Sequence, residues 1–125
     1  MKSNGEGSGV QVKTEFCPIV EAIRQIGGEW NMIVVRYLLD KPMGFNEILR
    51  NAKGMNSKTL SRVLKNLQGR SIVDRKIVST QPFSVEYSLT EKGAALHTIM
   101  DELKRWGEVW VLSQGKQGTG PLITD

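Results

Sequence analysis

Basic side chains are concentrated in one segment of this chain. Between Lys53 and Lys76 the sequence has seven basic residues and one acidic residue, Asp74, which gives the segment a formal charge of +6. The whole chain of 125 residues carries +4, so the remainder carries −2. A basic surface on a nearly neutral body attracts a polyanion. The segment therefore predicts one surface for a polyanionic partner, and the alternative is a solvated basic face.

The middle of this segment is predicted to form a helix over 57–68 with two unlike faces. Its apolar residues follow the i, i+3, i+4, i+7 spacing of a buried helical stripe, and they are Leu60, Val63, Leu64 and Leu67. Asn56 or Ser57 can cap the helix by accepting a hydrogen bond from its first turn. The polar side chains that are candidates for contact with a partner are Ser57, Lys58, Thr59, Ser61, Arg62 and Lys65.

Side chains of these types suit the grooves of duplex DNA. A helix fits the major groove, where Arg, Lys, Ser and Thr reach base edges, and its N-terminal amides attract phosphate. Lys53, in the predicted turn before the helix, and Arg75, on a strand after it, are further candidates for phosphate contacts. Alternation along a strand places Lys76 on the face opposite to Arg75. Double-stranded DNA is therefore the expected partner.

No pattern in the sequence indicates catalysis or metal binding. The chain has one cysteine, Cys17, and one histidine, His97, which excludes an intrachain disulfide and a cysteine-rich zinc site. We find no Ser/His/Asp set, no glycine-rich phosphate loop and no metal-ligand spacing. We therefore expect neither enzymatic activity nor a cofactor, and the sequence identifies no small-molecule effector.

The two ends of the chain differ from its middle. Residues 1–14 are rich in Gly and Ser, and neither they nor residues 114–125 show a hydrophobic period, so we expect a flexible arm and a flexible tail around one domain over 15–113. The N-terminal end lacks the apolar region of a secretory signal, and no apolar run is long enough to span a bilayer. We expect a soluble cytoplasmic protein without a membrane partner.

Hydrophobic periodicity, together with glycine and proline positions, predicts the remaining elements. Pro18 suits the first turn of a helix and Gly27-Gly28 ends it. Helices are expected at 18–26, about 29–39, 45–51 and 91–112, and strands at 72–79 and 84–89. A short helix, a turn, a second helix and a hairpin make a winged helix-turn-helix. The expected fold is mainly α with a small β-hairpin, and its first and last helices serve dimerisation.

The sequence resembles the HxlR family of winged-helix regulators in five blocks that span about residues 16–110. They are Cys17-Pro18, Ile26-Gly27-Gly28-Glu29-Trp30, Phe45-Asn46-Glu47-Ile48, Lys58-Thr59-Leu60-Ser61, and Val85-Glu86-Tyr87-Ser88-Leu89-Thr90-Glu91-Lys92-Gly93. The resemblance implies a DNA-binding homodimer that represses or activates nearby genes. It also implies a recognition helix over about 57–68 and a wing over about 75–85.

Two positions depart from the pattern of that family. Relatives often carry Arg or Lys just before the Val-Glu-Tyr block, in the wing, where this chain has Phe83-Ser84. Relatives also tend to have Gly between the recognition helix and the first wing strand, where this chain has Ser71. The wing tip is therefore expected to attract the minor groove only weakly through charge.

Cys17 has two interpretations. A free cysteine is often a small buried hydrophobic residue. Some relatives in the family that the sequence resembles respond to oxidants or electrophiles through the cysteine near the N-terminus, which here is Cys17. A helix N-terminus favours a thiolate, whereas the nearby Glu15 and Glu21 oppose it. Cys17 is therefore a candidate redox sensor, and the buried interpretation stays open.

The apolar stripes of the first and last helices predict a dimer interface. A domain this small has little apolar surface to offer such a long last helix, and unused apolar patches mark interfaces. The candidates are Ile19, Val20, Ile23, Leu103, Trp106 and Trp110. We hypothesise a sequence-specific transcriptional regulator that binds a pseudo-palindromic operator as a homodimer. The alternative is a winged-helix module that binds proteins and not DNA.

Overall fold

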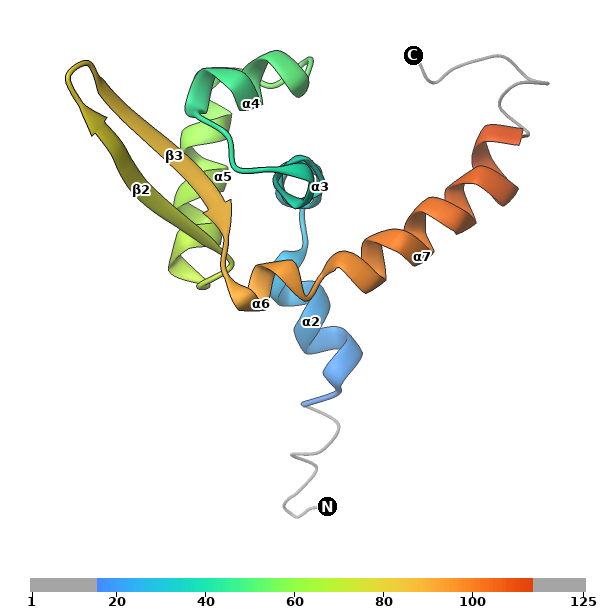
Figure 1. The fold of residues 1–125 in the computed structure, drawn as a ribbon. Coiled ribbons are helices and arrows are strands. Elements are labelled where there is room, and N and C mark those ends of the chain that lie inside the picture. Colours follow the sequence, from blue (N-terminus) through green and yellow to red (C-terminus); the bar gives the residue numbers. More distant parts are fainter. Residues whose placement is uncertain (1–15, 114–125) are drawn as a thin grey trace.

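The computed structural model of the chain describes residues 16–113 (Figure 1). The expected flexible arm over 1–14 and tail over 114–125 therefore lie outside the described residues. Its elements follow in the order α2 (Pro18–Ile26), α3 (Glu29–Asp40), α4 (Phe45–Asn51), α5 (Ser57–Gly69), β2 (Val73–Thr80), β3 (Phe83–Leu89), α6 (Glu91–Ala94), α7 (His97–Gly107) and the π-helical segment η1 (Glu108–Leu112). The expected mainly helical fold with one hairpin is confirmed.

The core lies between α3, α4, α5 and the base of the hairpin. Val34 and Val35 of α3, Ile48 of α4 and Leu60 of α5 are completely shielded from solvent. The apolar stripe predicted for the helix over 57–68, which is α5, is buried over its whole length. Each such side chain contributes roughly 1.5–3 kcal/mol when it leaves water, so this core fixes how α5 is oriented.

The hairpin is antiparallel and is paired almost to its tip. The register joins Val73 to Leu89 at the base and Thr80 to Phe83 at the tip, with a bulge between Ile77 and Ser79. The connection is shorter than the sequence indicates, because Thr80 and Phe83 both belong to the strands. Figure 1 shows the hairpin extending beyond the helices, as a wing does.

The turn between α5 and β2 has an unusual backbone at Ser71. Its φ angle is +61°, in the left-handed region that side chains disfavour and glycine accepts. The Ser71 carbonyl accepts a hydrogen bond from the Thr90 hydroxyl at 2.6 Å, and the same hydroxyl accepts one from the Gly93 amide at 3.0 Å. Thr90 therefore caps α6 and holds the exit turn of α5 in place.

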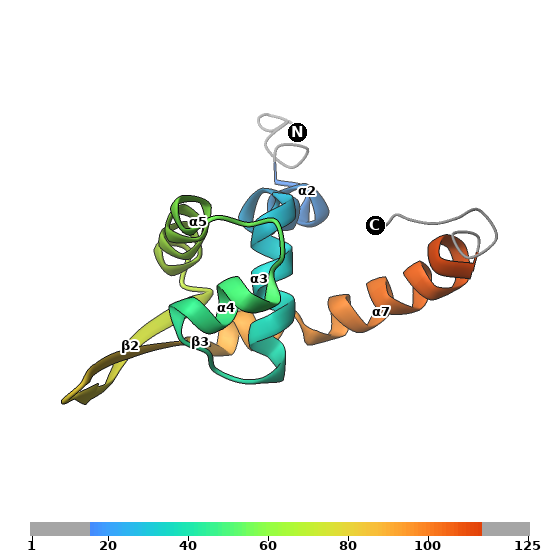
Figure 2. The same ribbon diagram turned by 90° about the horizontal axis from the view of Figure 1, so that it is seen from above.

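The prediction of one continuous helix over Glu91–Leu112 is wrong. The helix is interrupted at Ala95 and Leu96, where ψ is −14° and −7°, and the Leu96 amide bonds to the Gly93 carbonyl three residues earlier. Gly93 lies so close to the Ile72 carbonyl that it anchors α6, while Leu96 packs against the core. A tight turn then lets α7 leave the domain in its own direction, away from α2 (Figures 1 and 2).

Candidate nucleic-acid interface

The polar face of α5 is turned to solvent. Ser57, Lys58, Ser61, Arg62 and Lys65 are exposed, and Thr59 is half-buried at the edge of the face. The cap is Asn56 and not Ser57, because the Asn56 side-chain oxygen accepts the Thr59 amide at 2.8 Å. The Ser57 hydroxyl is therefore not needed for capping. No other segment of residues 16–113 covers this face.

The cations of α5 differ from three arginines on other helices. Arg24, Arg36 and Arg105 each pair with a carboxylate three or four residues away on their own helix. The sequence of α5 has no acidic residue, and its cations make no ion pair with any residue of 16–113. Lys58, Arg62 and Lys65 recur at i, i+4 and i+7, where like charges repel each other. An external anion would relieve this repulsion.

Lys53 and Arg75 flank α5 on two sides. Lys53 is exposed in the turn between α4 and α5, beside Gly54, whose φ of +94° suits only glycine. Arg75 is exposed on β2 opposite Tyr87, and Lys76 lies opposite Glu86. Because alternate residues share a face, Lys76 is on the face of two carboxylates, Asp74 and Glu86, and Arg75 is not. Arg75 is therefore separated from the two carboxylates, as a residue predicted to contact phosphate needs to be.

Arg70 is a member of the basic segment that bonds to the protein itself. Its guanidinium donates to the Gln25 carbonyl at 2.6 Å. The Lys92 ammonium donates to the Arg70 carbonyl at 2.7 Å and to the Gln25 side-chain oxygen at 3.0 Å. These bonds tie the end of α2 to the end of α5. The sequence gives no sign of them, because the partners lie 22 to 67 positions apart.

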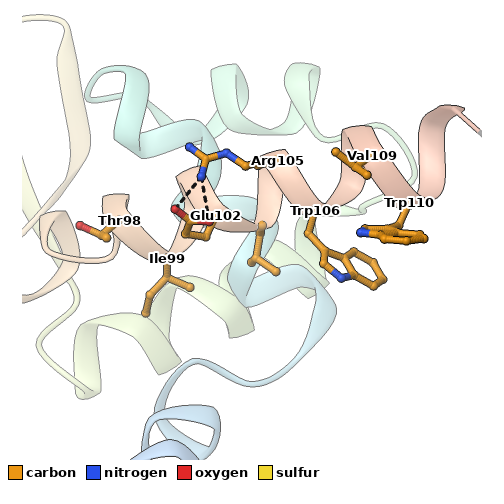
Figure 3. A pocket seen from close by; sticks show the side chains of 8 residues that line it. Thr98, Ile99, Glu102, Arg105, Trp106, Val109 and Trp110 are labelled. Carbon is orange, nitrogen blue, oxygen red and sulfur yellow. Dashed lines mark hydrogen bonds and ion pairs between the residues drawn. The ribbon is translucent and has the colours of Figure 1, made fainter.

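The six residues predicted for the dimer interface are all exposed in the single chain. Leu103, Trp106 and Trp110 line one apolar hollow along α7 and η1, together with Ile99 and Val109. Figure 3 shows Ile99, Trp106 and Trp110 along one side of the helix, with the Glu102–Arg105 pair beside them. The three residues of α2, which are Ile19, Val20 and Ile23, do not line this hollow. Helix α2, which carries these three residues, projects from the domain in a different direction from α7 (Figure 2).

Cys17 lies immediately before Pro18, at the N-cap position of α2, and is half-buried. Its carbonyl accepts the Glu21 amide at 2.9 Å, and its side chain makes no capping bond. Cys17 is therefore neither buried in the core nor fully exposed to solvent. Its side chain stands at the N-terminal end of α2.

Among residues 16–113 no three His, Cys, Asp or Glu side chains gather in a way that could hold a metal ion. His97 is exposed and lies 3.8 Å from Asp101. Lys41, at 2.7 Å, donates to Glu47 and lowers the pKa of that carboxyl, which is the opposite of what a general acid needs. None of the described helices is long and apolar enough to cross a bilayer.

The order of a short helix, a turn, an exposed polar helix and a hairpin agrees with a family described as "HxlR-like helix-turn-helix", whose model matches residues 25–115. The chain belongs to the HxlR-like helix-turn-helix family. In this HxlR-like protein, α4 and α5 form the helix-turn-helix and the β2–β3 hairpin forms the wing. The protein is a DNA-binding regulator of transcription with a winged-helix fold.

Relatives and solved structures agree with this assignment. The HTH-type transcriptional regulator BH0655 of Halalkalibacterium halodurans is 38% identical over 107 residues, which are 84% of this chain and 94% of the relative. The HTH-type transcriptional regulator YodB of Bacillus subtilis is 36% identical over 94 residues, 74% of this chain and 84% of YodB. The reduced form of the redox regulator HypR superposes with a TM-score of 0.71 at 34% identity, covering 78% of this chain and 99% of HypR.

Proposed function

We propose that this HxlR-like regulator binds a pseudo-palindromic operator as a homodimer, with α5 of each subunit in a major groove. The observation that carries the proposal is the exposed face of α5, which has three cations, two serines and no carboxylate. A face of this kind loses repulsion and gains hydrogen bonds when it meets a duplex. Phosphate contacts then supply affinity, and base contacts supply sequence choice.

The residues of the interface divide into two roles. Ser57, Lys58, Ser61 and Arg62 lie in the first half of α5, the end that enters the groove in a helix-turn-helix. Arg62 is the residue able to make a bidentate contact with a guanine. Lys53, Lys65 and Arg75 lie at the margins of the face and contact phosphates. Thr59, half-buried, contributes its hydroxyl at the edge.

The homodimer is supported by apolar surface that the single chain leaves in water. Trp106 and Trp110 are 59% and 57% exposed, and neither α2 nor α7 has a buried residue. Aromatic side chains of this size are typical anchors of interfaces. A two-fold dimer presents two α5 helices to half-sites about 34–36 Å apart, one turn of the duplex.

Selection of bound fragments from a random duplex pool tests this proposal. We expect recovery of a motif with two related half-sites whose centres lie about 10 base pairs apart. Arg62→Ala is expected to lower affinity for that motif by about ten-fold or more and to relax the preference at one position of each half-site. Arg36→Ala, which removes a paired cation of α3, is the matched control. Recovery of no motif contradicts the proposal.

As a second function we propose that Cys17 makes operator binding sensitive to oxidants. Its half-buried position at the start of α2 supports this, and the similar HypR is described as a redox regulator. Hydrogen peroxide would oxidise the thiolate to a sulfenic acid and release hydroxide. A second thiol, from another subunit or a small molecule, would then form a disulfide and release water. Equal operator binding by wild type and Cys17→Ser after mild peroxide treatment contradicts this role.

A further inference from the structure

A small apolar hollow lies between the end of α2, the turn before β2 and the turn after α6, and we call it the α2 hollow. Its volume is about 160 Å³. The residues that line it are Ala22, Gln25, Ile26, Ile72, Lys92 and Leu96. Ile72 is buried, and Ile26 and Leu96 pack against the core, so the walls of the α2 hollow are fixed by the fold. Figure 1 shows α6 beside the end of α2, where the α2 hollow lies.

Two cations meet at Gln25, on the wall of the α2 hollow. The Lys92 ammonium donates to the Gln25 side-chain oxygen at 3.0 Å, and the Arg70 guanidinium donates to the Gln25 carbonyl at 2.6 Å. Neither cation forms an ion pair with any of residues 16–113. The carboxylates nearest in sequence, Glu21 and Glu91, do not line the α2 hollow. Two positive charges therefore stand beside an apolar hollow without a neutralising carboxylate, and an ammonium group has a third N–H to donate.

The α2 hollow adjoins the exit of helix α5. The Ile72 amide donates to the Leu67 carbonyl at 2.9 Å, and the Ile72 carbonyl accepts the Thr90 amide at 3.0 Å, so Ile72 joins the end of α5 to the start of α6. Across the hollow, α2 has no buried residue. It is held to the domain by the packing of Ile26 and by the bonds of Gln25. A molecule in the α2 hollow would therefore add contacts between α2 and the exit of α5.

We propose that the α2 hollow binds a small apolar carboxylic acid of about the size of benzoate. A cavity of about 150 Å³ with apolar walls accommodates benzene, so one ring matches the volume here. The hydrocarbon body lies against Ile26 and Ile72, where it leaves water, and the carboxylate accepts a charge-assisted hydrogen bond from Lys92. The bound acid joins α2 to the exit of α5 and thereby modulates operator binding, and this second role rests on the proposed function of α5.

Binding of sodium benzoate to the full chain without DNA tests the site. Amide chemical shifts are expected to change at Ala22, Ile72 and Leu96, with a dissociation constant on the order of 1 mM, as suits so small a ligand. Acetate, which lacks the apolar body, and benzyl alcohol, which lacks the charge, are expected to bind about ten-fold more weakly. Equal shifts with acetate, or shifts confined to the exposed cations of α5, overturn the inference.

Two substitutions remove the two halves of the site. Lys92→Met keeps the apolar stem and removes the ammonium, and it is expected to weaken benzoate binding by about ten-fold. Ala22→Leu fills the α2 hollow from the exposed side of α2, and it is expected to abolish binding without lowering the thermal unfolding midpoint. Arg24→Met is the matched control on α2, because Arg24 pairs with Glu21 and does not line the hollow. Benzoate binding that survives in both Lys92→Met and Ala22→Leu overturns the inference.

Operator binding separates the site from the function on which its second role rests. On the duplex that the wild type selects, saturating benzoate is expected to change affinity by about five-fold relative to the same concentration of acetate, and the duplex is expected to change benzoate affinity by the same factor. Ala22→Leu is expected to show no such change. Benzoate that binds without altering operator affinity overturns the modulating role. If the wild type binds no duplex, the proposed function of α5 fails, and the measurements without DNA still decide the site.

Discussion

The ammonium group of Lys92 lies 2.7 Å from the carbonyl oxygen of Arg70, the residue that ends the recognition helix α5. The same ammonium reaches the Gln25 side chain, and Arg70 donates to the Gln25 carbonyl. Lys92 of α6 therefore joins the end of α2 to the end of α5. Together with Ile26, which packs against the core at the end of α2, these bonds set where α2 stands relative to the exposed face of α5.

Replacing Lys92 by methionine tests this connection. Lys92→Met keeps the apolar stem and removes the donor, and we expect the free energy of unfolding to fall by about 0.5–1 kcal/mol, since the bonds are exposed. Urea unfolding measures the change. Lys104→Met is the control, because the Lys104 side chain makes no hydrogen bond with residues 16–113, and it is expected to change stability by less than about 0.5 kcal/mol. Equal losses in both variants would show that the connection contributes nothing.

The left-handed backbone at Ser71 predicts a stabilising substitution. Ser71→Gly removes a steric cost of about 1–2 kcal/mol, partly offset by the greater freedom of glycine in the unfolded chain. We expect a net gain of about 0.5–1 kcal/mol in the free energy of unfolding. Ser71→Val is expected to lower it, because a β-branched side chain suits this conformation least. A stability ranking with valine above glycine would contradict the geometry of the turn.

Replacement by alanine is expected to change the stability of the protein differently at two glycines, Gly93 and Gly69. A Cβ at Gly93 would collide with the Ile72 carbonyl and crowd Leu89, so Gly93→Ala is expected to destabilise the protein by about 1–3 kcal/mol. A Cβ at Gly69, at the end of α5, meets no atom within 4 Å, and Gly69→Ala is expected to be neutral or to stabilise by up to about 1 kcal/mol. Thermal unfolding of the two variants provides the comparison.

The exposed indole side chains of Trp106 in α7 and Trp110 in η1 predict that truncating either residue weakens the dimer. Trp106→Ala is expected to weaken association by about 2 kcal/mol or more, which is roughly thirty-fold. Sedimentation at micromolar concentration is expected to find a dimer for the wild type and a mixture with monomer for the variant. Asp101→Ala, on the same helix, is expected to leave the mass unchanged. A monomeric wild type would remove the basis for a two-fold operator.

Local patterns were sufficient to predict most of the fold. The stripe of Leu60, Val63, Leu64 and Leu67 predicts α5 and its buried side, because helical period and burial agree there. The break at Leu96 does not follow from the local sequence, because the approach of Gly93 to Ile72 that holds α6 against the core joins residues far apart in the chain. The bonds of Arg70 and Lys92 were missed because they join residues far apart in sequence. The roles of the exposed side chains of α5 stay predictions.

Titration of duplex binding with salt tests the central claim most directly. On the selected duplex we expect the affinity of the wild type to fall steeply between about 50 and 200 mM salt, and that of Arg62→Ala to be lower throughout, with about 1–3 kcal/mol lost. Arg36→Ala is expected to follow the wild type. Binding that ignores salt, or that survives unchanged in Arg62→Ala, would show that the exposed face of α5 does not read DNA.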